Sequence, residues 1–217
     1  MRGLIEKDIR LTLIRKQTIV VFIAMALFMG VSMNGSFVVA YLTMLAMMIA
    51  IGTLSYDELD NGYAFLMTLP IDKKTYVKEK YLFTLGVSVI AWCIGAVLFC
   101  IVRVVQGNGG TAFAELPELM AIIPAMYMSG CILIPLQLKY GAEKSRIALF
   151  IIFGLIAVII FGSTTLLSSM NIPVEGISAS LDSISTAVVI PVLCALCIAA
   201  AFVSYLISTK IMNKKEF

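Results

Sequence analysis

The chain has 217 residues, of which 61% are hydrophobic and only 13% are charged. Soluble globular domains are about half apolar and about a quarter charged, so this composition excludes an ordinary soluble domain and predicts an all-α, polytopic membrane protein. The formal net charge of +3 is too small to indicate a nucleic-acid partner.

The N-terminal segment, residues 1–17, carries a partial amphipathic pattern. Ile5, Ile9 and Leu13 recur at four-residue spacing, and basic residues are dispersed around them. Such a pattern fits a helix that lies in the plane of the membrane interface. The alternative is a cytoplasmic extension of the first membrane span.

Six apolar stretches are candidate membrane spans, for which about 20 apolar residues are needed. The predicted spans lie near residues 19–31, 37–54, 81–105, 119–138, 147–167 and 187–208. Only Asn34, Gly35 and Ser36 separate the first two, so we expect these to be antiparallel neighbours. The first apolar run mimics a signal peptide, but no convincing small-residue cleavage site follows it, and we expect it to be retained.

A charged segment with turn residues, 56–80, separates the second span from the third. Gly62 gives the backbone freedom to turn, and the apolar stretch YAFLMTL predicts a short helix that Pro70 stops. Asp72 is well placed to cap a new helix, which meets no breaker between Lys73 and Val105. That helix would be about 50 Å long, and the hydrocarbon core is about 30 Å thick, so its basic first turns should project from the membrane.

An apolar tip on such a hairpin has two explanations, and the residues alone leave both open. The tip could lie against lipid headgroups, with the nearby lysines meeting anionic lipid. It could instead insert into a groove of a soluble partner.

The basic residues predict the orientation of the chain. All of them except Arg103 lie in residues 2–16, 73–80, 139–146 and 210–215, and the loops 106–118 and 170–186 contain no Lys or Arg. The positive-inside rule therefore places those four regions, and with them both termini, in the cytoplasm.

The sequence offers little for catalysis. The five cysteines fall inside predicted spans, where cysteine behaves as a small apolar residue. There is no histidine and no glycine-rich loop ending in Gly-Lys-Ser/Thr. We therefore predict no catalytic residue, no metal site and no cofactor on this chain, which is not an enzyme. If its work consumes ATP, another chain binds the nucleotide.

Two loops resemble a known family. ELDNGYAFLMTLPIDKKTYVKEKYL is similar to the segment after the second span in ABC transporter permeases of the type-2 exporter class, above all the small six-span branch of bacterial peptide exporters and antimicrobial-peptide resistance systems. The matching positions are Glu58, Gly62, Leu69, Pro70, Lys73, Lys74 and Tyr76. PLQLKYGAEKSRIALF resembles the loop between the fourth and fifth spans of that branch, with matches at Lys139, Gly141, Glu143, Lys144 and Arg146.

The resemblance implies a permease subunit in the bacterial cytoplasmic membrane. It implies a second permease subunit, identical or paralogous, and two cytoplasmic ATPase subunits that bind ATP and Mg. It also implies an N-terminal elbow helix over 1–17, lying against membrane lipid, and a coupling helix within 56–80 that inserts into a cleft of the ATPase. The inserted apolar face would be Tyr63, Phe65, Leu66, Met67 and Leu69, with Lys73, Lys74 and Lys78 at the rim.

Several further features have alternatives. The loop 139–146 would be a second ATPase contact, or only a basic turn that obeys the positive-inside rule. Arg103 is an interfacial anchor or a contact for an exiting substrate, and Glu115 and Glu118 form a solvated outer cap or part of an outer gate. Segment 170–186 is short beside the re-entrant helices of larger permeases of the class. The sequence leaves both alternatives, a gate and a plain loop, for this segment. By resemblance the fifth span lines a dimer interface, with small-residue candidates Gly154, Gly162 and Ser163.

Two functions from different classes remain. The first is the membrane subunit of an ATP-driven exporter of a hydrophobic or amphipathic substrate, by resemblance a peptide, although a lipid or a drug would suit the same path. The second is a membrane sensor or immunity protein that binds a partner and transports nothing. The spans contain few ionisable groups, which argues against a proton relay or an ion pore.

Overall fold

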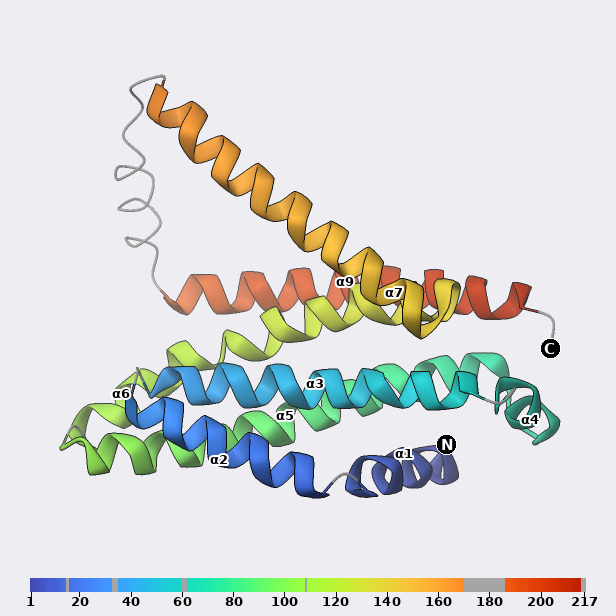
Figure 1. Ribbon diagram of the computed structural model, residues 1–217, viewed down its shortest axis with the longest axis horizontal. Helices are drawn as coiled ribbons and strands as arrows, with labels where there is room; N and C mark the ends of the chain where they lie inside the picture. Colours follow the sequence, from blue (N-terminus) through green and yellow to red (C-terminus); the bar gives the residue numbers. More distant parts are fainter. Residues whose placement is uncertain (15, 33–34, 60–61, 108, 170–185, 216–217) are drawn as a thin grey trace.

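The computed structural model describes residues 1–14, 16–32, 35–59, 62–107, 109–169 and 186–215. Every regular element in these ranges is a helix, which confirms the all-α prediction (Figure 1). The helices are α1 (Arg2–Ile14), α2 (Lys16–Ser32), α3 (Ser36–Glu58), α4 (Gly62–Thr68), α5 (Lys73–Val105), α6 (Gly109–Leu119), α7 (Ile122–Ser169) and α9 (Thr186–Lys214).

Four helical stretches among the described residues are long and apolar enough to cross a membrane. They are Ser36–Glu58, Lys73–Val105, Glu115–Ser145 and Val188–Lys214. α1 and α2 meet at an angle of 67°, and only together are they long and apolar enough to cross a membrane. If this bent pair is one span, the described residues contain five candidate spans. The backbone is also helical through the predicted spans 19–31 and 147–167, and the sixth span stays a prediction.

The four basic regions of the sequence gather at one end of the molecule. The N-terminus, α4, the bend of α7 and the C-terminal end of α9 lie together, and α6 lies at the opposite end beside the junction of α2 and α3 (Figure 1). We call the first of these the basic end. Its composition is the charge asymmetry that a multi-pass membrane protein shows between its two sides.

The helices share a core that runs from the basic end into the bundle. Its buried members include Leu54 of α3, Tyr76 of α5, Leu138 of α7 and Met212 of α9. Close packing of α3 on α5 depends on Gly95, because a Cβ there would lie 3.0 Å from the Cα of Val39. Large apolar side chains on the outside of the bundle remain exposed, as a surface facing lipid requires.

The segment around α4 follows the sequence prediction closely. α4 ends at Thr68, just before Pro70, and α5 has the predicted bounds, Lys73–Val105. Asp72 stands at the N-cap position with an extended backbone, but its side chain makes no capping hydrogen bond. The prediction of that cap was therefore right in position and wrong in mechanism.

Two predicted loops differ from expectation. Most of the predicted outer loop 106–118 is helix α6, in which Gly109 and Gly110 form the first turn and Pro117 stands near the end. The predicted fourth and fifth spans form one helical run, α7, which bends at Gly141 where φ is 80° and ψ is 172°. The predicted segment 170–186 lies outside the described residues except for its last residue, and the predicted turn at 34–36 lies partly outside them.

The bend at Gly141 gives a stability prediction. We expect Gly141→Ala to lower the free energy of unfolding by about 2 kcal/mol, because a side chain at positive φ is strained and its Cβ would overlap the Glu58 carboxylate. Gly86→Ala on α5 is the matched control, since no atom lies within 4 Å of its Cβ position and alanine favours a helix. The measurement is reversible unfolding in detergent micelles. Equal stability of the two variants would contradict the strain.

Candidate functional site

Helix α4 presents two different faces at the basic end. Tyr63 and Leu66 are buried and face the bundle. The Tyr63 ring meets Tyr76 edge-on with centroids 6.0 Å apart, and the Lys215 ammonium lies 4.9 Å from the centroid of the Tyr63 ring. These contacts attach α4 to the start of α5 and to the C-terminal end of α9.

The other side of α4 is exposed and apolar, and so is Leu69, which directly follows the end of the helix at Thr68. Phe65 is 68% exposed and Leu69 is 41% exposed, while Met67 is half-buried. The prediction that five apolar residues form one inserted face is therefore too broad, because Tyr63 and Leu66 belong to the chain's own core. Residues three apart lie on the same face of a helix, so Tyr63 and Leu66 share a face that Phe65 does not share.

The remaining predicted hairpin residues are structural or solvent-facing. A Cβ at Gly62 would lie 2.8 Å from the Asp57 carbonyl oxygen, so glycine allows the chain to turn back over the end of α3. The Lys73 ammonium donates to the Lys215 carbonyl oxygen at 2.7 Å. Lys74, Lys78 and Pro70 are exposed.

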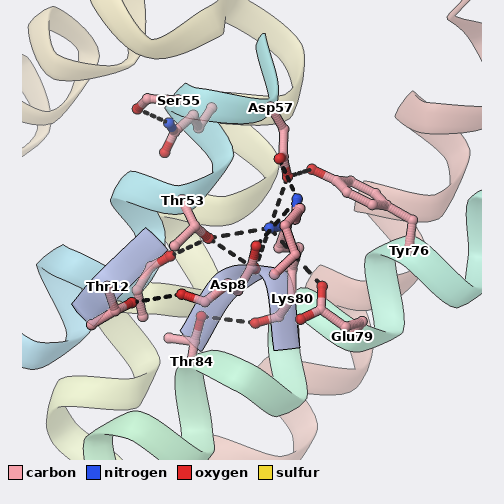
Figure 2. Close-up of polar contacts among 12 residues, drawn as sticks. Asp8, Thr12, Thr53, Ser55, Asp57, Tyr76, Glu79, Lys80 and Thr84 are labelled. Carbon is pink, nitrogen blue, oxygen red and sulfur yellow. Dashed lines mark hydrogen bonds and ion pairs between the residues drawn. The ribbon is translucent and has the colours of Figure 1, made fainter. Parts of the chain in front are cut away.

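A group of charged side chains, buried except for the half-buried Lys7, joins three helices beneath the hairpin (Figure 2). We call it the charged clasp: Lys7 and Asp8 from α1, Asp57 from α3, and Glu79 and Lys80 from α5. The Lys80 ammonium pairs with Asp8 and with Asp57, the second at 2.8 Å. The side chain of Lys80 is 1% exposed and that of Asp8 is 0% exposed.

Neutral partners complete the charged clasp. The hydroxyl of Thr53 accepts from Lys80 at 3.1 Å, and it shares its one proton between the Ala50 carbonyl oxygen at 2.8 Å and Asp8 at 3.1 Å. The Tyr76 hydroxyl donates to Asp57 at 2.9 Å. Lys7 pairs with Asp57 and lies 3.2 Å from Asp8. Burying an ion costs several kcal/mol unless partners replace its water, so this shell is what allows the charges to be buried.

Glu79 is the least satisfied member of the charged clasp. Its carboxylate lies 4.0 Å from the Lys80 ammonium, and neither of its oxygens has a hydrogen-bond partner among the described residues. With every group ionised, the clasp would hold two cations and three carboxylates. The clasp is a compact joint of ion pairs between helices. In the described ranges, no group of three or more His, Cys, Asp or Glu residues is arranged to hold a metal ion.

Lys7 of the clasp and Tyr63 of α4 have shifted pKa values. Burial by itself would lower the pKa of Lys7, but the hydrogen bond and charge of Asp57, together with Asp8, outweigh it and raise that pKa. Burial raises the pKa of the Tyr63 hydroxyl, and the nearby charges of Asp57 and Glu58 add to the rise. Lys7 therefore stays a cation and Tyr63 stays neutral at physiological pH.

The sequence prediction missed the roles of Asp8 and Lys80. Lys80 was only one of four lysines in a basic stretch, and Asp8 stood in a partly amphipathic segment. One signal was present, because Asp8 lies four residues after Leu4 and so shares its face of a helix. Leu4 and Asp8 are the two buried residues of α1.

The second predicted cytoplasmic loop touches the first. The carboxylate of Glu58 accepts a hydrogen bond from the backbone N–H of Ala142 at 2.8 Å, and Gly141 is packed against that carboxylate. Lys139, Glu143 and Lys144 are exposed, and the side chain of Arg146 lies outside the described residues. Glu58 and Gly141, each predicted from a separate loop, are thus neighbours.

The residues predicted for the outer side and for the dimer interface lie in different surroundings. Arg103 pairs with Glu115, and its guanidinium lies 5.5 Å from the centroid of the Phe99 ring, so the pair fastens α6 to α5. Glu118 is exposed. Gly154 is exposed on α7 with no atom within 4 Å of its Cβ position, and the side chains at 162 and 163 lie outside the described residues.

Comparison with known proteins gives a family match. The model of a family described as ABC-2 family transporter protein matches residues 3–213, nearly the whole chain. No curated protein and no solved structure matches the chain.

The charged clasp gives a prediction about coupled mutations. Lys80→Met should lower the free energy of unfolding by about 3–5 kcal/mol, because it strands buried carboxylates. The double variant Asp8→Asn with Lys80→Met should lose less than the sum of the two single losses, since it strands one carboxylate fewer. Reversible unfolding in micelles measures all three, with Glu6→Gln as the exposed control on α1. Additive losses would show that Asp8 and Lys80 do not interact.

Proposed function

The chain belongs to the ABC-2 family of transporter proteins, and on that premise we propose that it is the transmembrane permease subunit of an ATP-driven exporter. With its several membrane-length apolar helices, it is a multi-pass membrane protein. We propose that it crosses the bacterial cytoplasmic membrane six times with both termini in the cytoplasm, and that α1 is the elbow helix at the inner leaflet. The 67° bend between α1 and α2 favours an elbow over a straight extension of the first span.

The observation that supports this function best is the two-faced helix α4. Its inner face is fixed to the bundle through Tyr63 and Leu66, while Phe65 and Leu69 remain available to a groove on a partner. α5 then runs without interruption from Lys73 to Val105. A push on α4 by a closing ATPase dimer would therefore pass along a rigid helix into the membrane.

In this proposal, partner subunits supply the ATP hydrolysis and the second half of the membrane domain. We propose two ATPase subunits that bind ATP and Mg, and a second permease subunit, identical or paralogous. Lys74 and Lys78 are exposed beside α4 and would meet acidic groups at the rim of the ATPase cleft. Glu143 and Lys144, next to the bend of α7, would make the second, smaller contact, and Gly154 would lie in the interface between permeases.

The proposed substrate is hydrophobic or amphipathic, most simply a peptide. A groove of about 770 Å³ runs beside α3 from the basic end. Its wall combines apolar side chains such as Phe22, Met44 and Met48 with polar ones such as Tyr56, Glu143 and Lys144. A lipid or a drug would match the same combination. A sensor or immunity protein that only binds a partner is the alternative function.

Coexpression with candidate ABC ATPase subunits separates these functions. Phe65→Asp should abolish copurification of the ATPase, because it places a charge in an apolar contact, whereas Phe65→Leu should retain it. Lys74→Glu should weaken the complex about tenfold or more if the lysine meets a carboxylate. The matched control is Lys214→Glu, which reverses an exposed charge at the same end of the chain. If no ATPase copurifies with the unmodified chain or with any of these variants, the chain is not an exporter subunit.

Labelling of single cysteines tests the proposed orientation. A cysteine introduced at Thr68, which is exposed on α4, should react with a membrane-impermeant thiol reagent only after the cells are opened. A cysteine introduced at Gln106, which is exposed at the opposite end of α5, should react in intact cells. The unmodified protein measures the background from its own cysteines. The reverse labelling pattern would place α4 outside the cell and overturn the proposal.

A further inference from the structure

We propose that the charged clasp makes α1 a moving part of the transporter, so that displacement of the hairpin carries α1 with it and opens a second route of coupling into the membrane. This inference rests on the proposed function for the source of the displacement. Asp8 of α1 and Lys80 of α5 are positioning residues in this proposal: they lie outside α4, the proposed contact with the ATPase, and they hold α1 to the hairpin.

The charged clasp lies at the root of the hairpin. Asp57 stands at the end of α3, five residues before α4 begins, and Lys80 lies two helical turns into α5. Both arms of the hairpin therefore contribute charges to one joint. Asp8 brings α1 into the same joint (Figure 2). Lys7 does so as well, through its pair with Asp57.

α1 has few other attachments to the bundle. Its buried residues are Leu4 and Asp8, while Ile9, Leu13 and Ile14 are exposed along the rest of the helix. An exposed apolar edge of this kind slides easily in a lipid interface. The contacts of Asp8 and Lys7 are directional, and they fix α1 to the hairpin.

The joint resists separation for electrostatic reasons. Asp8 and Lys80 are buried, and parting them would leave two opposite charges without water in a medium of low dielectric constant. Lys80 also pairs with Asp57 and donates to Thr53, both of α3. Any movement of this root therefore has to move α1 as well.

The consequence reaches the membrane through α2. One residue separates the end of α1 from the start of α2, which meets it at 67°. A shift of α1 would tilt or draw α2, the proposed first span. The hairpin would thus act on the bundle through α5 directly and through α1 and α2 by way of the clasp.

Amide hydrogen exchange of the full chain in nanodiscs tests the attachment of α1. Asp8→Asn is nearly isosteric and leaves two cations against two carboxylates, so the fold should survive. The amides of α1 should exchange about tenfold faster or more, because a buried hydrogen bond to a charged group is lost. Glu6→Gln makes the same chemical change in an exposed pair on the same helix and should leave exchange within about twofold. Equal exchange in these two variants would overturn the clasp.

A second variant keeps the test independent of charge. Thr53→Val removes the neutral partner of Asp8 and Lys80 and leaves every charge in place. It should speed the exchange of α1 by less than Asp8→Asn does. A larger effect than that of Asp8→Asn would mean that packing at α3, and not the ion pair, holds α1.

The coupling role is tested by amide hydrogen exchange of the complex with the ATPase, with and without the non-hydrolysable nucleotide AMP-PNP. In the unmodified protein, nucleotide should change the exchange of both α4 and α1; in Asp8→Asn it should change that of α4 alone. A response of α4 without any response of α1 in the unmodified protein would overturn this inference and leave the proposed function standing. Failure to form any ATPase complex would overturn the proposed function and the coupling role together, while the exchange of the isolated chain still decides whether the clasp holds α1.

Discussion

The pairing of buried charges at the basic end constrains the rest of the architecture. In a chain this apolar, neither Asp8 nor Lys80 can be placed against hydrocarbon without a partner. Each finds the other across a separation of 72 residues, with Asp57 completing the arrangement. Apolar packing between membrane helices is weakly directional, because lipid offers similar contacts. Ion pairs with defined geometry therefore set how α1, α3 and α5 are positioned relative to one another.

The same constraint explains why α4 has an exposed face. The polar joint and the buried side of α4, Tyr63 and Leu66, hold the hairpin firmly to the bundle. Phe65 and Leu69 are then left outside on a rigid support. An apolar anchor presented on a preorganised element binds a groove at a lower entropic cost than one on a flexible loop. The stable attachment of one side of α4 would thus support the proposed recognition of an ATPase by the other side.

The sequence predicted those features that depend on local chemistry. α5 has the expected bounds because Pro70 precedes it and no breaker interrupts it before Val105. The gathering of basic residues at one end followed from their spacing along the chain. The helix α6 was missed because glycines and a proline in a short segment between two apolar stretches favour a loop. The link from Asp8 to Lys80 and that from Glu58 to Ala142 could not be predicted, since periodicity identifies a buried face and not the partner that buries it.

Three polar links extend from the hairpin to the other parts of the basic end. Asp8 and Lys80 connect it to α1, the bond from Lys73 to the Lys215 carbonyl connects it to the end of α9, and Glu58 connects it to the bend of α7. The last of these fixes the start of the helical segment after Gly141, where an acceptor is favourable for the free backbone N–H groups. Since each link joins the hairpin to a different helix, a displacement applied at α4 reaches α1, α7 and α9 as well as α5. In the proposed permease, such a distribution would let one small contact surface with an ATPase move the whole bundle.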